Sequence, residues 1–291
     1  MSTIQRTFIP GSQWVYFKLY TGPKTADDLL MKAIAPVLRK LQKKQVFEKW
    51  FFIRYSDPDF HLRVRLLLND VRYIGVVFLL FHKELTKWNT DHLLWKVQLD
   101  TYNRELERYG KNLIEEAESV FYADSECMLS ILKRLNSNEN YRWMIALKLI
   151  NELLSDFGLN TEEKQKLMND LEKAYKTEFG FNEFNAKQFN TKFRENKKTV
   201  ESVLNNRFNE NEFLSLFQPI KKRSKQLIPI VGQIKIKATK DHSVNELLRS
   251  YLHMMLNRLF RSNNRIHELI LYDFMYRYYT SELAKEKYNK K

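Results

Sequence analysis

The sequence predicts an α+β fold in which a small, mainly antiparallel sheet in the N-terminal third packs with a larger helical portion. Strand-like alternation of side chains recurs in the first hundred residues. Apolar side chains at helical spacing dominate the chain from about residue 125 onward. The 291 residues include 44% hydrophobic residues but few glycines and prolines, 7 and 6, which suits a substantial core. We therefore expect a single domain over residues 1–291.

The N-terminal third is predicted to contain both strands and helices. Residues 13–20, QWVYFKLY, alternate as a strand does, and residues 26–41 place their aliphatic side chains on one helical stripe. Thr25 stands where an N-cap belongs. The turn residues SDPD, at 56–59, separate two further strands and predict a hairpin. Strands are expected at 50–55, 61–68 and 94–101, and a second helix at 71–88.

The remaining two thirds of the chain are predicted to be mainly helical. Gly158 and Gly180 stand where glycines end helices, and Ser243 with Glu246 forms a capping-box pattern. One later strand is expected, at residues 227–237. The helices are expected at residues 125–135, 141–156, 161–178, 186–204, 243–260 and 264–285.

The net charge of +14 is concentrated at the C-terminal end of the chain. Residues 221–291 contain 16 Lys and Arg residues against 6 Asp and Glu residues, and KKRSK, at 221–225, is expected to be an exposed basic loop. Such a charge attracts nucleic acid or an acidic peptide, but a Lys- and Asn-rich composition produces it without any partner. Because no nucleic-acid motif with interleaved aromatic residues stands out, direct RNA or tRNA binding is the less favoured interpretation.

Further features of the sequence indicate a cytoplasmic protein without a metal or cofactor. The single cysteine, Cys127, excludes an internal disulfide framework and a cysteine-based zinc site. The N-terminus lacks the apolar run of a signal peptide, and no stretch approaches the ~18 apolar residues of a membrane span. The histidines lack metal-ligand spacing, and no phosphate-loop or dinucleotide-binding glycine pattern occurs.

The HLRVR segment is the most unusual stretch of the sequence. In a strand, His61, Arg63 and Arg65 share one face at ~7 Å spacing, while the aliphatic residues between them point into the core. Two guanidinium groups at that spacing suit one carboxylate-bearing ligand or two separate carboxylates. The alternative is an edge strand whose charges prevent aggregation. The spacing alone does not decide between them.

Two other segments carry charged residues whose simplest interpretation is structural. In YNRELERYG, Glu105 and Arg108 are i,i+3 neighbours on a predicted helix, where a surface ion pair is the commoner outcome. In FYADSE, Asp124 or Ser125 is interpreted as the cap of the helix that follows. Neither segment by itself predicts a site.

The LHMMLNRLF segment combines polar residues with an otherwise apolar helix. His253 and Asn257 are i,i+4 neighbours on one face, and Arg258 flanks them. These three side chains are costly to bury unless they are paired. Histidine is also the side chain that titrates near neutral pH, so His253 is a candidate for proton transfer.

Five segments, taken together, carry a family resemblance. They are WVYFKLY, FIRYSDPDFHLRVR, TYNRELERYG, FYADSE and HMMLNRL. Their order and approximate separations resemble the C-terminal elimination domain of class I lanthipeptide dehydratases, also called the thiopeptide-type bacteriocin biosynthesis domain. The resemblance covers nearly the whole chain. The family's large glutamylating domain does not precede these segments here, so we expect the standalone half of a split system.

The resemblance implies β-elimination on a ribosomally made precursor peptide. A separate, tRNA-dependent glutamylating subunit would first esterify Ser or Thr side chains with glutamate. This protein would then act as a lyase that removes the glutamate and leaves dehydroalanine or dehydrobutyrine. Such chemistry needs a base for the Cα proton, positive charge for the developing enolate, and cations for the departing carboxylate.

The motif match also assigns catalytic roles. Arg63, Arg65 and Arg108 would bind the glutamyl group and stabilise charge. His253 would act as an acid or a base, and Glu105 would either orient an arginine or act as the base.

Three more residues of the matched motifs are assigned to substrate binding: His61, Asn257 and Arg258. The family often has a glycine soon after the NRL residues, where this chain has Phe260, Arg261 and Ser262. The local geometry after Arg258 is therefore left open.

Two other functions remain as alternatives. The first is a pyridine-forming cyclase of the thiopeptide type on the same fold, which is less favoured because those relatives do not keep the full set of arginines, glutamate and histidine. The second is a non-catalytic basic subunit that binds precursor peptide, a partner enzyme or tRNA. Convergence of the arginines with His253 would argue against that role. The sequence leaves a homodimer open.

Overall fold

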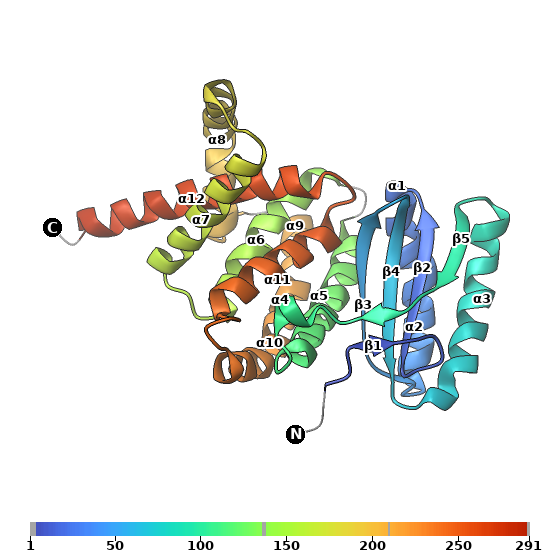
Figure 1. The fold of residues 1–291 in the computed structure, drawn as a ribbon. Helices are drawn as coiled ribbons and strands as arrows, with labels where there is room; N and C mark the ends of the chain where they lie inside the picture. The colour runs from blue at the N-terminus through green and yellow to red at the C-terminus, as the bar shows by residue number, and fades with distance from the viewer. Residues whose placement is uncertain (1–3, 136–137, 209, 290–291) are drawn as a thin grey trace. The chain divides into compact units, whose positions relative to one another are not determined.

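The computed structural model describes residues 4–135, 138–208 and 210–289, and the chain divides into two compact units (Figure 1). Unit 1 consists of Met1–Lys133 and Gly232–Ser262, and unit 2 consists of Arg134–Val231 and Asn263–Lys291. All strands assigned to the described residues lie in unit 1, and the elements of unit 2 are helices. The predicted α+β class is confirmed.

A four-stranded antiparallel sheet is the framework of unit 1. Its order is β3–β4–β2–β5, so β3 and β5 are the two edge strands. The strands are β2 (Trp14–Thr21), β3 (Phe47–Ser56), β4 (Phe60–Leu68) and β5 (Leu94–Leu99). Strands β3 and β4 pair up to the SDPD turn, which confirms the predicted hairpin.

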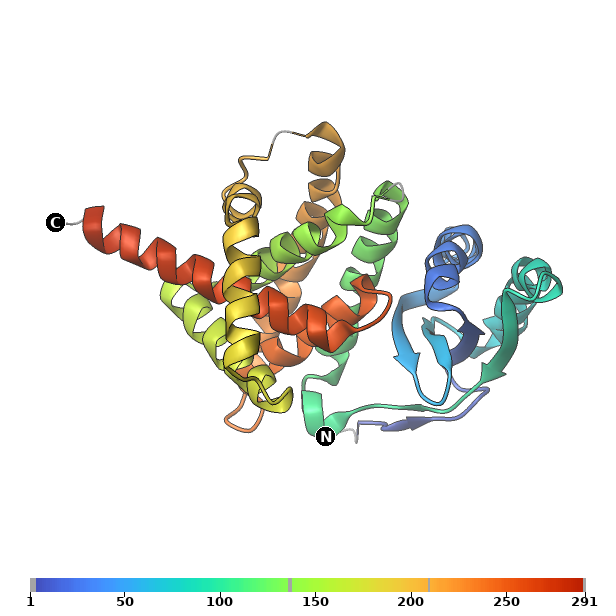
Figure 2. The ribbon, with the colours of Figure 1, turned by 90° about the horizontal axis from the view of Figure 1, so that it is seen from above.

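Helices cover the apolar face of this sheet. Leu19, Leu62 and Val64 on that face are completely buried, and the ring of Phe17 stacks on that of Phe81 at 4.3 Å. Figure 2 shows these helices on one side of the sheet. The helical segments are α1 (Pro23–Leu29), the π-helix η1 (Leu30–Ile34), α2 (Ala35–Lys43), the 3₁₀-helix η2 (Val71–Tyr73) and α3 (Ile74–Thr90).

The first helix begins earlier than the sequence indicates. Gly22 occupies the N-cap position and Pro23 begins the helix, so the N-cap predicted at Thr25 is wrong. Proline suits the first helical position because its fixed φ is already helical and its missing N–H would have no partner there.

The remaining elements of unit 1 lie on the other side of the sheet and along the edge of β3. Strands β1 (Thr7–Phe8) and β6 (Tyr102–Asn103) form a two-stranded sheet. The helices are α4 (Leu106–Tyr109), α5 (Ile114–Arg134) and α11 (Val244–Leu259). Ser243 accepts a hydrogen bond from the Glu246 amide at 3.3 Å, which confirms the predicted N-cap of α11.

Unit 2 is a group of helices with well-defined ends. Asn160 and Glu163 form a reciprocal capping box at the start of α7. Gly158 and Gly180 have φ of 77° and 59° just after helices, as predicted. The helices are α6 (Asn140–Asp156), α7 (Thr161–Glu178), α8 (Glu183–Leu204), α9 (Asn211–Ser215), α10 (Phe217–Lys237), whose last residues belong to unit 1, and α12 (Asn264–Asn289).

The strand predicted at 227–237 is wrong, because these residues form the second half of helix α10. The β-branched run suggests a strand, but Leu227, Val231 and Ile234 recur at helical spacing and are buried together on one stripe. The basic loop predicted at 221–225 is also wrong. Those residues are helical. The lysines at 221, 222 and 225 are exposed as predicted, whereas the side chain of Arg223 is 1% exposed.

The interpretation of FYADSE as a helix cap is wrong as well. Asp124 and Ser125 lie in the middle of α5, and both are completely buried. The Ser125 hydroxyl accepts a hydrogen bond from the Phe52 amide at 3.2 Å. These polar residues therefore connect α5 to other parts of unit 1 instead of starting a helix.

The described residues were also searched for membrane spans and metal sites. None of their helices combines the length and the apolar character needed to cross a membrane. Among the same residues, no group of three or more His, Cys, Asp and Glu side chains is placed to hold a metal ion.

Candidate functional site

The face of the sheet opposite helices α1–α3 carries several cations. Arg63 on β4 is directly opposite Lys18 on β2. Arg65 lies two residues further along β4, so its side chain is on the same face of the sheet. Lys96 on β5 faces the same side, because it pairs with a β2 residue two positions from Lys18. Lys18 forms an ion pair with Asp100. The alternation predicted for HLRVR is therefore part of a wider basic face.

His61 is a neutral residue that holds Arg63. It is completely buried, and its Nε2 accepts a hydrogen bond from Arg63 Nε at 3.1 Å. Nδ1 must then carry the proton, which it donates to the Asp59 carbonyl at 2.8 Å. Burial lowers the pKa of His61, and the charge of Arg63 adds to this effect. The His61 ring stacks on Tyr20, and the Arg63 guanidinium lies 3.4 Å from the ring centre of Tyr55.

Arg65 is enclosed by aromatic rings. Its guanidinium carbon lies 4.3 Å from the ring centre of Tyr16, 4.8 Å from Tyr102 and 5.3 Å from Phe51. Its side chain is largely buried, and its Nε has no hydrogen-bond partner among the described residues. The rings stabilise the charge without using its donors. The Nε of Arg65 is therefore a buried donor without a partner among the described residues.

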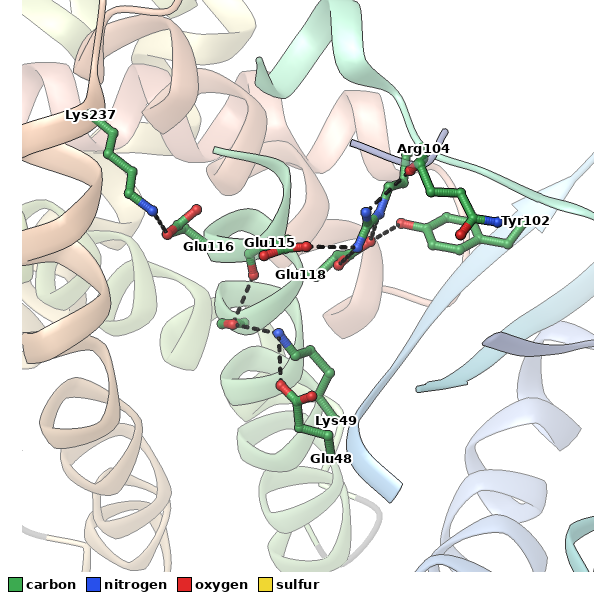
Figure 3. Close-up of polar contacts among 10 residues, drawn as sticks. Glu48, Lys49, Tyr102, Arg104, Glu115, Glu116, Glu118 and Lys237 are labelled. Atoms are coloured by element: carbon green, nitrogen blue, oxygen red, sulfur yellow. Dashed lines mark hydrogen bonds and ion pairs between the residues drawn. The ribbon is translucent and has the colours of Figure 1, made fainter. Parts of the chain in front are cut away.

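The YNRELERYG segment is extended before it becomes helical, so Arg104 lies before helix α4 and Arg108 lies on it. Arg104 points inward, with Nε and Nη2 donating to the two oxygens of Glu118 at 2.7 and 2.8 Å. The Tyr102 hydroxyl donates to Glu118 at 2.9 Å. Figure 3 shows Arg104 and Tyr102 reaching this carboxylate on α5. This buried pair fixes the segment that leads into α4.

Helix α4 carries the predicted Glu105–Arg108 pair to helix α11. Arg108 Nη1 lies 3.5 Å from Glu105 Oε2, and both side chains are substantially exposed. Arg108 Nε donates to the hydroxyl of Ser250 on α11 at 3.0 Å. The ring of Tyr109 stacks on that of Tyr251, with ring centres 6.0 Å apart. The ion pair is thus held against α11.

Helix α11 presents His253 between two anchored positions. His253 follows Ser250 by three residues and precedes Asn257 by four, so all three share one helix face, and His253 is partly exposed. The Asn257 side chain accepts from the Arg54 amide and donates to the Arg54 carbonyl, both at 2.9 Å. Asn257 therefore attaches α11 to the edge of β3.

Arg258 is a buried cation behind this face. It is completely buried, its Nη1 donates to the Met254 carbonyl at 2.8 Å, and it lies 3.8 Å from Asp124. Its guanidinium is 4.9 Å from the ring centre of Phe121. Burial lowers the pKa of Arg258 to about 10, with Asp124 opposing and Arg65 reinforcing the shift. Arg258 is therefore still protonated at neutral pH.

The surroundings of Arg65 and Arg258 form one continuous aromatic cluster. Phe51 lies over Arg65 and contacts Phe121, with ring centres 5.4 Å apart, and Phe121 lies beside Arg258. Tyr109 also contacts Phe121, at 5.3 Å. The sheet, α4 and α11 are thus connected within unit 1. Unit 1 therefore contains fixed cations on the sheet and a partly exposed histidine on α11, which are groups that suit binding and reaction of a carboxylate ester.

Several residues of this region escape the sequence analysis. Lys18 and Lys96 are each the single charged residue of an otherwise mainly apolar strand. That pattern in the sequence could have identified them as candidate site residues. Arg54 alternates onto the apolar face, where its Nη2 pairs with buried Asp27 at 2.5 Å, and nothing local in the sequence marks that pair. Asp124 lies in a helix and resembles a cap only because its neighbours are polar.

The chain matches a known protein family over most of its length. Residues 14–279 match the family described as lantibiotic biosynthesis dehydratase, C-terminal. The chain is similar to the subtilin biosynthesis protein SpaB of Bacillus subtilis, with 29% identity over 183 residues. That match covers 60% of this chain and 17% of SpaB, so the chain spans only a small part of that relative.

Two solved structures share the fold. The tRNA-dependent lantibiotic dehydratase MibB from Microbispora sp. 107891 aligns with a TM-score of 0.74 and 19% identity, over 96% of this chain and 29% of MibB. The pyridine synthase TbtD from thiomuracin biosynthesis aligns with a TM-score of 0.65 and 11% identity, over 93% of this chain and 98% of TbtD. At these identities the likeness concerns the fold alone.

Proposed function

Because the chain belongs to the lantibiotic biosynthesis dehydratase C-terminal family, we propose that it eliminates glutamate from glutamylated Ser or Thr residues of a ribosomally made precursor peptide. The products are dehydroalanine or dehydrobutyrine and free glutamate. A separate tRNA-dependent subunit supplies the glutamyl ester. The observation that carries this proposal is the basic face of the sheet, where His61 holds Arg63 and aromatic rings enclose Arg65.

The elimination can be written with its atoms and electrons balanced. A base removes the Cα proton of the modified residue, and the C–H electrons form the Cα=Cβ bond. The Cβ–O bond breaks, and its electron pair leaves with the glutamate carboxylate. Negative charge therefore develops first near the peptide carbonyl and then on the leaving group. Fixed cations at both positions lower the barrier.

Arg63, Arg65 and Lys18 are suited to the leaving group. Free glutamate carries two carboxylates, and guanidinium groups bind carboxylates through paired donors. Arg63 is positioned by the His61 ring, whereas Arg65 is positioned by aromatic rings that leave its Nε without a partner among the described residues. Holding these cations in place before the substrate arrives avoids their reorganisation during the reaction.

His253 and the Glu105–Arg108 pair are suited to proton transfer and charge stabilisation. His253 is partly exposed on the same helix face as Ser250, which Arg108 contacts. An imidazole can act as a base or as an acid, so His253 can take the Cα proton or protonate the departing carboxylate. Arg108 completes the positive surroundings, and Glu105 orients it.

The contacts of the three predicted substrate-binding residues favour positioning roles for them. His61 is buried and accepts a hydrogen bond from Arg63, and Asn257 pairs with the backbone of β3. Arg258 is buried beside Asp124 and adds positive potential behind Arg65. We propose that these residues hold or polarise the groups that contact the substrate.

The direct test is an elimination assay followed by mass spectrometry. A peptide with a glutamyl-Ser ester is incubated with the purified protein and with its Arg65→Ala and His253→Ala variants. We expect the wild type to release glutamate and leave a dehydrated residue, while both variants leave the ester intact. Arg39→Ala is the matched control, because Arg39 is exposed on α2 in the same unit. An untouched ester with the wild type would overturn the proposal.

A pyridine-forming cyclase is the second candidate, because the chain aligns over 98% of the pyridine synthase TbtD. The two reactions give different products from different peptides. A cyclase would join two dehydroalanines and expel an N-terminal fragment, and it would release no glutamate. Incubation with a peptide that contains two dehydroalanines therefore separates the candidates by mass.

A further inference from the structure

The two edge strands of the four-stranded sheet differ in how their outward backbone groups are hydrogen-bonded. At the β3 edge, the Phe52 amide donates to Ser125, and both backbone groups of Arg54 pair with Asn257. Side chains of α5 and α11 thus complete that edge. Strand β5 forms the other edge. Uncovered edges are rare in natural proteins, because they can pair with another chain.

The register shows which backbone groups of β5 face outward. The Asp100 amide donates to the Tyr16 carbonyl, and Gln98 is directly opposite Lys18. Alternate residues of an antiparallel strand direct their backbone groups to the same side, so Gln98 and Asp100 face β2. Val97 and Leu99 then direct their N–H and C=O groups outward. No hydrogen bond from the part of the chain that the structure describes reaches those groups.

The outward positions of β5 border an apolar groove. A cavity of about 580 Å³ lies between β5 and α3, lined by Phe17, Phe81, Val97 and Leu99 among others. The edge side chains are unusually exposed for their type: 51% for Trp95, 45% for Val97 and 40% for Leu99. An added strand would hydrogen-bond to the outer backbone and place alternate side chains over this groove.

The charges around the groove favour an acidic occupant. Lys96 on β5 lines the groove and is exposed. Lys83 and Lys87 are exposed elsewhere on α3, and Glu84 is already paired with Lys40. Asp91 is the remaining carboxylate of residues 80–99. A second copy of this chain that paired through the same edge would bring its own Lys96 to that edge, and like charges oppose such pairing. An acidic peptide is attracted instead.

We propose that the outer edge of β5 and the groove beside α3 bind an extended, acidic and apolar segment of the substrate peptide as a fifth strand. This inference rests on the proposed function, which requires a peptide substrate. Neighbouring strands lie about 4.8 Å apart, so a strand added to β5 would lie about 14 Å from β4. About four extended residues span that distance. The bound segment is therefore separate from the residue that reacts.

The test measures peptide binding independently of catalysis. The probe is a fluorescein-labelled ten-residue peptide that alternates valine with aspartate, and fluorescence anisotropy reports its binding. A matched probe alternates valine with lysine. We expect the acidic probe to bind at least tenfold more tightly than the basic one. We also expect it to slow amide exchange at Val97 and Leu99.

Two substitutions at one position separate backbone pairing from packing. Val97→Pro removes an outward N–H that β2 does not use, a change that edge strands tolerate, and should weaken binding at least tenfold. Val97→Thr keeps the N–H and the side-chain shape, and should bind within about twofold of the wild type. Val97→Asp keeps the backbone N–H but adds a negative charge that repels the acidic probe, so it should also weaken binding. This variant tests the site if the proline variant does not fold.

The outcomes also separate this inference from the proposed elimination. Equal binding by Val97→Pro, Val97→Thr and the wild type would overturn it, as would absence of binding to the acidic probe. A wild-type dimer that Val97→Pro converts to a monomer would identify a second copy as the occupant instead. The rate of glutamate elimination from a short glutamylated peptide should be the same for the wild type and the Val97 variants. If the wild type eliminates nothing but binds the probe at Val97, the proposed function fails while this site stands.

Discussion

The Asn257 side chain pairs with the backbone of Arg54 as a neighbouring strand would, accepting from its N–H and donating to its C=O at 2.9 Å each. This double hydrogen bond completes the edge of β3 and fixes the rotation of α11 about its axis. His253 precedes Asn257 by one helical turn on the same face. The orientation of the candidate acid or base is therefore set by an amide that takes no part in the chemistry.

Replacing Asn257 with alanine should destabilise the protein. Both backbone groups of Arg54 lose their partners, and Arg54 is buried. Leaving a buried donor or acceptor unpaired costs about 1–3 kcal/mol. We expect the free energy of unfolding in urea to fall by that amount. Asn196→Ala is the control, because Asn196 is half-buried and its side chain donates to the Lys192 carbonyl of its own helix. Equal midpoints for the two variants would contradict the structural role.

Arg65 should be sensitive to the shape of its cation as well as to its charge. Arg65→Lys keeps the charge but loses the planar group that stacks on Tyr16 and Tyr102. Arg65→Met removes the charge and keeps most of the side-chain volume. We expect glutamate release to fall about tenfold with lysine and about 10²–10³-fold with methionine, the range for losing a group that stabilises developing charge.

Initial rates of glutamate release, with urea unfolding measured in parallel, test this ranking. A methionine variant that is as active as the wild type would remove Arg65 from the reaction. A methionine variant that is inactive only because it has unfolded would show its loss in the urea measurement.

The buried Arg104–Glu118 pair should matter more for stability than an exposed pair nearby. Arg104→Met leaves the completely buried Glu118 without its cation, and breaking a buried pair in this way costs about 3–5 kcal/mol. Changing both residues to methionine should restore part of that loss, because no buried charge remains. The Tyr102 hydroxyl, which also donates to Glu118, prevents full recovery.

Arg6→Met provides the comparison, because the Arg6–Glu107 ion pair is exposed on both sides. Exposed pairs contribute little, so its unfolding midpoint should stay close to that of the wild type. If the Arg6 and Arg104 variants are destabilised equally, the burial of the Arg104 pair has no energetic consequence.

Local periodicity predicts much of this fold. The alternation around Leu62 and Val64 identified β4 and its buried face, and the SDPD turn identified the hairpin. Such patterns succeed because an element that buries one face must repeat its apolar residues with its own geometric period. The glycine ends of helices, at Gly158 and Gly180, were equally visible, because few other residues adopt that backbone conformation.

Pairings between distant segments account for what the sequence did not predict. Asp124 and Ser125 resemble a helix cap locally. Yet Asp124 lies beside Arg258, and Ser125 accepts a hydrogen bond from the Phe52 amide. Arg104 resembles a surface residue until Glu118 is placed beside it. In each case the partner lies on another element, and no local pattern records it. His61 is different, because its partner Arg63 lies two residues along the same strand.

The pairing of His61 with Arg63 predicts how stability depends on pH. His61 Nε2 accepts from Arg63 Nε, so a proton on Nε2 would break this bond and place two positive groups together. Burial, followed by the charges of Arg63, Lys18 and Arg65, lowers the pKa of folded His61 below its ordinary value of 6.5. As the pH falls through 6.5, the unfolded chain takes up a proton that the folded chain does not. The folded state therefore loses stability on acidification.

The matched variant is His61→Asn, which keeps a donor for the Asp59 carbonyl and does not titrate. Below pH 6.5, the free energy of unfolding of the wild type should fall more steeply than that of the variant. The difference in slope is at most about 1.4 kcal/mol per pH unit, the limit for one proton. His267, whose pKa burial also lowers, is present in both proteins and cancels in the comparison. Urea unfolding between pH 5.5 and 7.5 measures both curves, and parallel curves would show that His61 titrates equally in the folded and unfolded chains.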